Sequence, residues 1–175
     1  MAYEPTIRIM KIKKSQTENP ANTPPPHKPN IYQRIFVVEN DADSRRLNSE
    51  ILIHAGYHVD TAEDGSTAWD ILQLNSYDLL ITAQHMPKVS GVELLKKMHD
   101  TTMRLPTIMT TRTLPTWEFT LHPWLQSVTM LRKPYTFDNL LGNVKTVLHA
   151  TTVVREEMAP PLNWQIQPLA DRFRV

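Results

Sequence analysis

Two short groups of polar residues could do chemistry, because each directly follows a run of apolar residues. Residues 39–41 (Glu-Asn-Asp) follow the run 35–38, and residues 83–85 (Ala-Gln-His) follow the run 79–82. Continuous apolar runs of this length are typical of strands that are buried on both faces. In open parallel sheets, ligands bind outside the carboxyl ends of the strands, where the strand order reverses. We therefore expect the function of the chain at these two strand ends.

Other residue patterns exclude several classes of enzyme. The four glycines lie far apart, so neither a phosphate loop nor a glycine-rich dinucleotide turn can form, and the GxSxG pattern of serine hydrolases is absent. The chain has no cysteine, which excludes a thiolate nucleophile, a disulfide and a cysteine-based zinc site. His54 and His58 have helical spacing, but Gly56 is expected to end the helix between them, so we expect no shared metal.

Strand and helix patterns alternate from residue 34 onward. A helix with Leu47, Ile51 and Ala55 on one face is expected to end at Gly56, and the final helix shows the clearest apolar spacing. Alternation of this kind predicts an α/β fold: a doubly wound, five-stranded parallel sheet of flavodoxin-like order 2-1-3-4-5 with helices on both faces. We expect its strands at residues 35–38, 57–61, 79–82, 107–110 and 128–131.

The composition predicts one domain with a tail at each end. Residues 1–32 contain six of the 14 prolines and are expected to be disordered, as a solvated tail or a proline-rich docking segment. Residues 33–151 form the expected domain. Residues 152–175 are expected to be irregular, either loosely packed on the domain or used to bind a partner. No second folded domain fits in so few residues, so we expect no DNA-binding output module.

The charge balance argues against two kinds of partner. Nineteen basic and 18 acidic residues give a formal net charge of +1, which offers no attractive field for nucleic acid or acidic lipid. No apolar run approaches the roughly 18 residues of a membrane span, and the N-terminus has no signal-peptide core. We expect a soluble, cytoplasmic protein that binds neither nucleic acid nor membrane.

From residue 34 to residue 151, the chain resembles a response-regulator receiver domain, the CheY-like phospho-acceptor module of two-component signalling. The Met-Pro…Gly-x-Glu-Leu string and the Lys-Pro-aromatic string are specific when they occur together. The motifs that support the resemblance lie, in order, at residues 37–41, 77–81, 86–94, 106–111 and 133–135.

The resemblance implies transfer of a phosphoryl group from a histidine kinase to an aspartate, assisted by a divalent ion that an acidic pair holds. The chain departs from this pattern, because Ala83 occupies the acceptor position and a methyl group cannot attack phosphorus. Glu39 and Asn40 occupy the positions of the acidic pair, so one acid is now an amide. We expect no cofactor: Mg²⁺ binding is expected to be weak or absent, with Glu39 as a residual weak ligand, and Asp41 is expected to cap the first helix.

By the same resemblance, Thr111 occupies the hydroxyl position and Lys133 the lysine position that hold the transferred oxygens. Without the aspartate, Lys133 would be a costly, partly buried charge. We expect it to pair with Glu39, or with Thr111 and a carbonyl at a strand end. Met130 occupies the aromatic switch position, and a flexible thioether cannot swing in and out as a tyrosine ring does.

The segment before the last strand is unusually aromatic. Pro115 and Pro123 bracket a short helix, and Pro123 is expected to end it. In the family, the fourth helix, fifth strand and fifth helix form the partner-binding face. Trp117, Phe119 and Trp124 are therefore expected either to pack in the core or to form a hydrophobic docking patch.

The resulting hypothesis is a single-domain, degenerate receiver that is not an enzyme and binds a protein partner without phosphorylation. The expected partner is a histidine kinase or another regulator, and a second copy of the chain stays open as a partner. The alternative is an orthodox phosphorelay receiver that is phosphorylated at a substitute residue, such as Thr82 or Glu39. An enzyme that uses the same cleft is disfavoured, because no nucleophile–base pair or glycine loop converges there.

Overall fold

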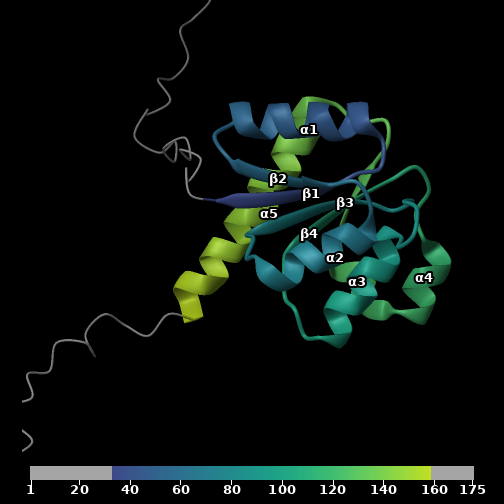
Figure 1. Cartoon of the computed structure of the whole chain (residues 1–175). Helices are drawn as coiled ribbons and strands as arrows, with labels where there is room; N and C mark the ends of the chain where they lie inside the picture. The colour runs from purple at the N-terminus through teal and green to yellow at the C-terminus, as the bar shows by residue number, and fades with distance from the viewer. Residues whose placement is uncertain (1–32, 159–175) are drawn as a thin grey trace, which may run out of the picture.

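The structure, a computed structural model, describes residues 33–158 and contains one five-stranded parallel sheet of order β2-β1-β3-β4-β5. The strands are β1 (Arg34–Val38), β2 (His58–Ala62), β3 (Leu79–Ala83), β4 (Thr107–Thr111) and β5 (Thr129–Arg132). The helices are α1 (Ala42–His54), α2 (Gly65–Leu74), α3 (Gly91–Asp100), α4 (Thr116–Leu121) and α5 (Phe137–Met158), with a 3₁₀ turn, η2 (Pro123–Ser127), after α4. Figure 1 shows α1 on one side of the sheet and α2, α3 and α4 on the other. The predicted fold class and strand order are confirmed.

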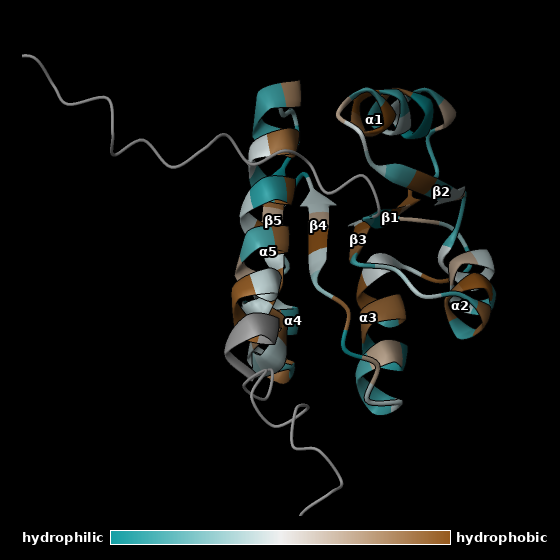
Figure 2. Cartoon of the chain, turned by 90° about the vertical axis from the view of Figure 1, so that its left-hand side faces the viewer, coloured by the Kyte–Doolittle hydropathy of each residue, from teal (hydrophilic) through white to brown (hydrophobic). Residues whose placement is uncertain are grey.

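Alternating residues of the strands supply two separate cores. Phe36 and Leu80 pack with α2 and α3, whereas Ile35 and Ile81 pack with α1 and α5. Figure 2 shows hydrophobic residues in brown along β1, β3 and β4, between the helices. Because strands buried on both faces are mostly apolar, the short apolar runs of the sequence identified the centre of the sheet.

Capping residues at its two ends determine where α1 begins and ends. The Asp41 carboxylate accepts a hydrogen bond from the Ser44 backbone N–H (3.2 Å) and caps α1, as predicted. Gly56 follows the helix with a φ of 93°, a conformation that favours glycine, and this confirms the expected end of α1. The residues that follow β1 are therefore held at a helix N-terminus, beside the carboxyl end of the sheet.

Two expectations about the helices are wrong. Leu47 is 42% exposed, and the buried residues of α1 include Asn48 and Leu52, because the Asn48 amide has a partly buried hydrogen-bonding partner, Tyr135, on the other side of a groove. The last helix also continues past residue 151 to Met158, since no glycine or proline interrupts residues 143–158. The predictions for residues 1–32 and 159–175 lie outside the described residues. Within residues 33–158, no helix is both long and apolar enough to cross a membrane.

Candidate functional site

The structure brings the predicted strand ends together around a hollow of about 360 Å³ at the carboxyl edge of the sheet. Its lining comes from the ends of β1, β3, β4 and β5, which the parallel topology places at one edge. The predicted site residues that line it are Glu39, Asn40, Ala83, Thr111 and Lys133. The other predicted residues, Met130 and the three aromatic residues around α4, lie elsewhere.

A lysine–carboxylate pair crosses this hollow. The ammonium nitrogen of Lys133 lies 2.6 Å from Oε2 of Glu39, although β3 and β4 separate their strands in the sheet. The Glu39 side chain is 4% exposed and that of Lys133 is 24% exposed. A buried carboxylate needs a compensating charge, so this contact is what makes the burial of Glu39 tolerable. The prediction that Lys133 pairs with Glu39 is confirmed.

Backbone and amide N–H groups occupy the remaining oxygen of the same carboxylate. Asp41 donates its backbone N–H to Oε1 of Glu39 (3.3 Å). When the Asn40 amide is oriented to suit its neighbours, its nitrogen donates to Oε1 of Glu39 (3.2 Å) and to the carbonyl of His85 (3.0 Å). Arg45 donates to the Glu39 carbonyl (2.6 Å). Both carboxylate oxygens of Glu39 therefore already accept hydrogen bonds from nitrogen donors.

The Thr111 hydroxyl is also held by protein groups. It is buried and hydrogen-bonds with the side-chain oxygen of Gln84 and with the carbonyl of Thr113, and it accepts the Thr113 backbone N–H (3.1 Å). Sequence reasoning did not assign a role to Gln84. Its place directly after a buried strand was a usable signal, because that position faces the carboxyl edge of the sheet.

Ala83 ends β3 in the middle of the hollow. Its side chain is a buried methyl group, and the α3 N-terminus packs directly against its backbone. A Cβ atom at Gly91 would lie 2.2 Å from the Ala83 carbonyl oxygen, so only glycine fits there. Thr110 is paired with Ala83 across β3 and β4, and its buried hydroxyl has no hydrogen-bonding partner among residues 33–158. No group on Ala83 itself can act as a nucleophile.

The aromatic residues around α4 divide into two kinds. Phe119 and Trp124 are partly buried and pack against the core, and Trp124 stacks on His99 with ring centroids 4.3 Å apart. Trp117 is 69% exposed. The three aromatic residues therefore do not form one surface. The exposed apolar residues of this region instead follow one face of α4 and its N-terminal turn, and they are Leu114, Trp117 and Leu121.

Met130, in β5, is partly buried and packs against the same core as Phe119. Its contacts with the core hold this side chain in a packed position, unlike a switch residue that moves between a buried and an exposed position.

A second hollow, of about 540 Å³, adjoins the first one. It lies between α1 and the segment that joins β5 to α5, and Asn48 donates to the Tyr135 hydroxyl across it (3.0 Å). Burial raises the pKa of the Tyr135 hydroxyl, so this group stays protonated at neutral pH. Sequence reasoning did not identify this hollow, because its walls come from segments that are far apart in the chain.

Side chains that could ligate a metal ion are spread apart in the described part of the chain. Among residues 33–158, no three His, Asp or Glu side chains cluster closely enough to hold an ion. Mg²⁺ requires oxygen ligands, and the oxygens that face the hollow from Glu39 and from the His85 carbonyl are engaged by N–H donors. The Glu39 carboxylate and the His85 carbonyl are therefore part of a hydrogen-bonding network.

Comparison with known proteins agrees with the fold. The family model described as the response regulator receiver domain matches residues 35–145. The chain is 38% identical over 80 residues to the two-component response regulator-like PRR37 of Oryza sativa, which covers 43% of this chain and 11% of that protein. It is 26% identical over 122 residues to the transcriptional regulatory protein DltR of Streptococcus agalactiae, covering 70% of this chain and 54% of DltR.

A solved structure matches the described fold. The response regulator TrrA of Thermotoga maritima, determined in complex with Mg²⁺-BeF, has a TM-score of 0.58 and 28% identity, covering 66% of this chain and 98% of that one. The chain thus spans nearly all of a solved response regulator but about half or less of the two curated relatives above.

Proposed function

This chain belongs to the response-regulator receiver family, and from that premise we propose that it acts by binding a protein partner without being phosphorylated. The observation that supports this proposal most directly is Ala83. Ala83 lines the same hollow as Glu39 and Lys133, at the position that the motif spacing assigns to the phospho-acceptor. A methyl group cannot form a bond to phosphorus, so no acyl phosphate can form at this position.

The proposal includes the absence of a working Mg²⁺ site, because the residues present do not suit the ion. Glu39 is paired with Lys133, and the Asn40 amide presents N–H groups where a cation would need oxygen atoms. An ion would have to break the pair and displace the amide before it gained Glu39 as a ligand.

Phosphorylation at a substitute residue is the alternative function, and the geometry opposes it. The Thr82 side chain is fully buried, and its hydroxyl donates to the Ala83 carbonyl (3.2 Å). The Glu39 carboxylate is nearly as buried and forms the pair with Lys133. Neither oxygen is free to attack a phosphodonor from solvent.

For the partner-binding surface, we propose the exposed apolar residues Trp117 and Leu121 of α4, together with Leu114 just before the helix. Buried tryptophans are common at the centres of interfaces, because a large ring removes much apolar surface from water. An ion pair between Lys96 and Glu118 (3.3 Å) ties α4 to α3, so the face is held on the domain. A histidine kinase or another regulator is the class of partner that the family suggests.

The deciding experiment is intact mass after incubation of the full chain with acetyl phosphate and Mg²⁺. We expect no added phosphoryl group on the wild type, and none or little on Ala83→Asp. We expect the double variant Ala83→Asp/Asn40→Asp to gain one group, because it restores both the nucleophile and the second carboxylate. A phosphoryl group on the wild type would overturn the proposal, and mapping it would identify the substitute residue.

Binding to candidate histidine kinases and regulators provides the second test. A Trp117→Gln variant should weaken binding about tenfold or more, in line with the loss of a central aromatic contact. The matched control is Leu74→Gln, which alters an exposed apolar residue on α2. Binding that requires the phosphodonor, or that Trp117→Gln leaves unchanged, would contradict the proposal.

A further inference from the structure

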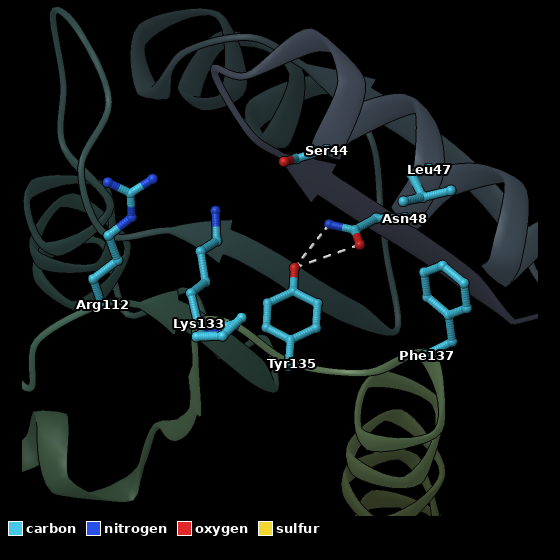
Figure 3. Close-up of a pocket in the computed structure, with 8 residues that line it drawn as sticks. Ser44, Leu47, Asn48, Arg112, Lys133, Tyr135 and Phe137 are labelled. Carbon is cyan, nitrogen blue, oxygen red and sulfur yellow. Dashed lines mark hydrogen bonds between the residues drawn. The ribbon is translucent and has the colours of Figure 1, made fainter.

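We propose that the groove between α1 and the β5–α5 segment binds a small amphipathic anion, a carboxylate or phosphate ester that carries an aromatic or aliphatic group. The groove measures about 540 Å³, within the range of about 300–1,000 Å³ that is usual for small-molecule sites. Figure 3 shows the side chains of Lys133 and Tyr135 extending toward the helix that carries Ser44 and Asn48, with Arg112 on the far side of Lys133. This inference does not depend on the proposed function.

The polar end of the groove is suited to a negative charge. Ser44, Arg112 and Lys133 line both this groove and the strand-end hollow, so they mark the place where the two spaces meet. Two of these residues are cationic, and none of the described residues that line the groove is Asp or Glu. An anion at this end would therefore meet the Arg112 guanidinium and the Ser44 hydroxyl, beside a lysine whose charge Glu39 already offsets.

Arg112 is available for such a ligand. Its side chain is exposed and makes no hydrogen bond, ion pair or ring contact with any other residue between 33 and 158. Lys133, by contrast, is engaged with Glu39. A guanidinium group presents a planar fork of N–H donors that matches a carboxylate or phosphate in two parallel bonds. Arg112 is thus the residue that we expect to provide most of the affinity for the anionic group.

The other end of the groove is apolar. Leu47 and Phe137 are 42% and 49% exposed, and both face this space from α1 and the start of α5. Pro134 and the Tyr135 ring complete the wall, while the Tyr135 hydroxyl is tied to Asn48. Burial of an exposed aromatic ring and an exposed leucine against a ligand removes apolar surface from water on both sides. The opposed ends require a ligand that is itself polar at one end and apolar at the other.

Two-dimensional ¹H–¹⁵N spectra of the full chain test the proposal, with phenyl phosphate as the probe. We expect saturable shifts at Ser44, Leu47, Arg112 and Phe137, with a dissociation constant in the millimolar range or below. Inorganic phosphate, which lacks the ring, and phenol, which lacks the anion, should each bind at least about tenfold more weakly. A carboxylate arm that uses phenylacetate separates the two anion types.

Variants distinguish this site from general binding of anions. Arg112→Gln should weaken phenyl phosphate about tenfold or more, and Phe137→Ala should do so about as strongly. The matched controls are Arg132→Gln and Ile53→Ala, which alter an exposed arginine and an exposed apolar residue outside the groove. The proposal is overturned if no saturable shift occurs at 20 mM probe (roughly twenty times a 1 mM dissociation constant), if phosphate alone binds as tightly as the ester, or if Arg112→Gln binds as the wild type does.

Discussion

Two lysine–carboxylate pairs lie at the carboxyl edge of the sheet, and each has a nitrogen–oxygen distance of 2.6 Å. One joins Lys133 to Glu39 across the candidate site. The other joins Lys88, after β3, to Asp64, after β2. Both carboxylates are almost fully buried, but the Lys88 side chain is 63% exposed whereas that of Lys133 is 24% exposed.

The difference between the pairs lies in what else holds the carboxylate. Asp64 is the N-cap of α2, and its other oxygen accepts the Thr67 backbone N–H at 2.8 Å. Glu39 caps no helix, and its backbone and amide contacts are longer, at 3.2–3.3 Å. Asp64 is thus supported by local structure, while Glu39 depends on a lysine 94 residues away. The comparison teaches that Asp64 keeps its structural role whatever Lys88 does, whereas the Lys133–Glu39 pair is a long-range contact across the site.

The largest effect is expected from Lys133→Met. Removal of the lysine leaves the Glu39 carboxylate buried without its counter-charge, and breaking a fully buried pair costs about 3–5 kcal/mol. Because Lys133 is 24% exposed, we expect a smaller loss of about 2–3 kcal/mol in the free energy of unfolding, measured by urea denaturation.

Its control is a double-mutant cycle with Glu39→Gln. The double variant Glu39→Gln/Lys133→Met should recover much of the stability that Lys133→Met loses, since no buried charge is then left unpaired. A double variant whose loss equals the sum of the losses in Lys133→Met and Glu39→Gln would show that the two side chains do not interact.

The next largest effect is expected from Asn40→Asp without a metal ion. The substitution removes the amide donor to the His85 carbonyl and places a second carboxylate beside Glu39. We expect a loss of about 1 kcal/mol in the free energy of unfolding. Millimolar Mg²⁺ should raise the melting temperature of this variant and leave the wild type unchanged. A wild type that Mg²⁺ stabilises as much as the variant would contradict the proposal that the Asn40 amide makes the site unsuited to Mg²⁺.

Acid titration examines the second pair. The hydrogen bond from Lys88, followed by that from Thr67, lowers the pKa of Asp64 from 3.8 to about 2. A lowered pKa means that this stabilisation is fully present above pH 3.8 and is lost as the pH falls toward about 2. Asp64→Asn keeps an N-cap oxygen but carries no charge, so its stability should fall less over this range. Parallel acid-unfolding curves for the two proteins would contradict the assignment.

The sequence predicted the parts of the site that local signals or nearest neighbours determine. Apolar runs identified the central strands, Asp41 marked the start of α1, and the parallel order brought 39–41 and 83–85 to one edge. The Lys133–Glu39 pair was also predictable, because a charge that has lost its usual partner needs another one nearby.

The parts that could not be predicted depend on contacts between distant segments. Asn48 is a polar residue on the buried side of α1 only because Tyr135, 87 residues away, provides a hydrogen-bonding partner. The Gln84 side chain hydrogen-bonds with the Thr111 hydroxyl, 27 residues away, and no sequence pattern around either residue predicts this contact. Helical periodicity assigned Leu47 to the core. A pattern of apolar residues cannot predict that a polar residue such as Asn48 is buried, because its burial depends on a hydrogen bond to a distant segment.

The smallest effect is expected from the lysine of the second pair. Lys88→Met should lower the urea midpoint far less than Lys133→Met does, because Lys88 is mostly exposed and Asp64 keeps its bond to Thr67. In Lys88→Met, the pKa of Asp64, followed by its carboxyl ¹³C signal, should rise from about 2 toward 3.8, since the bond to Lys88 is the largest cause of the lowering. Lys88 also has a φ of 63°, so Lys88→Gly, which favours that conformation, should be at least as stable as Lys88→Met. If Lys88→Met were as unstable as Lys133→Met, exposure of the lysine would not be what separates the two pairs.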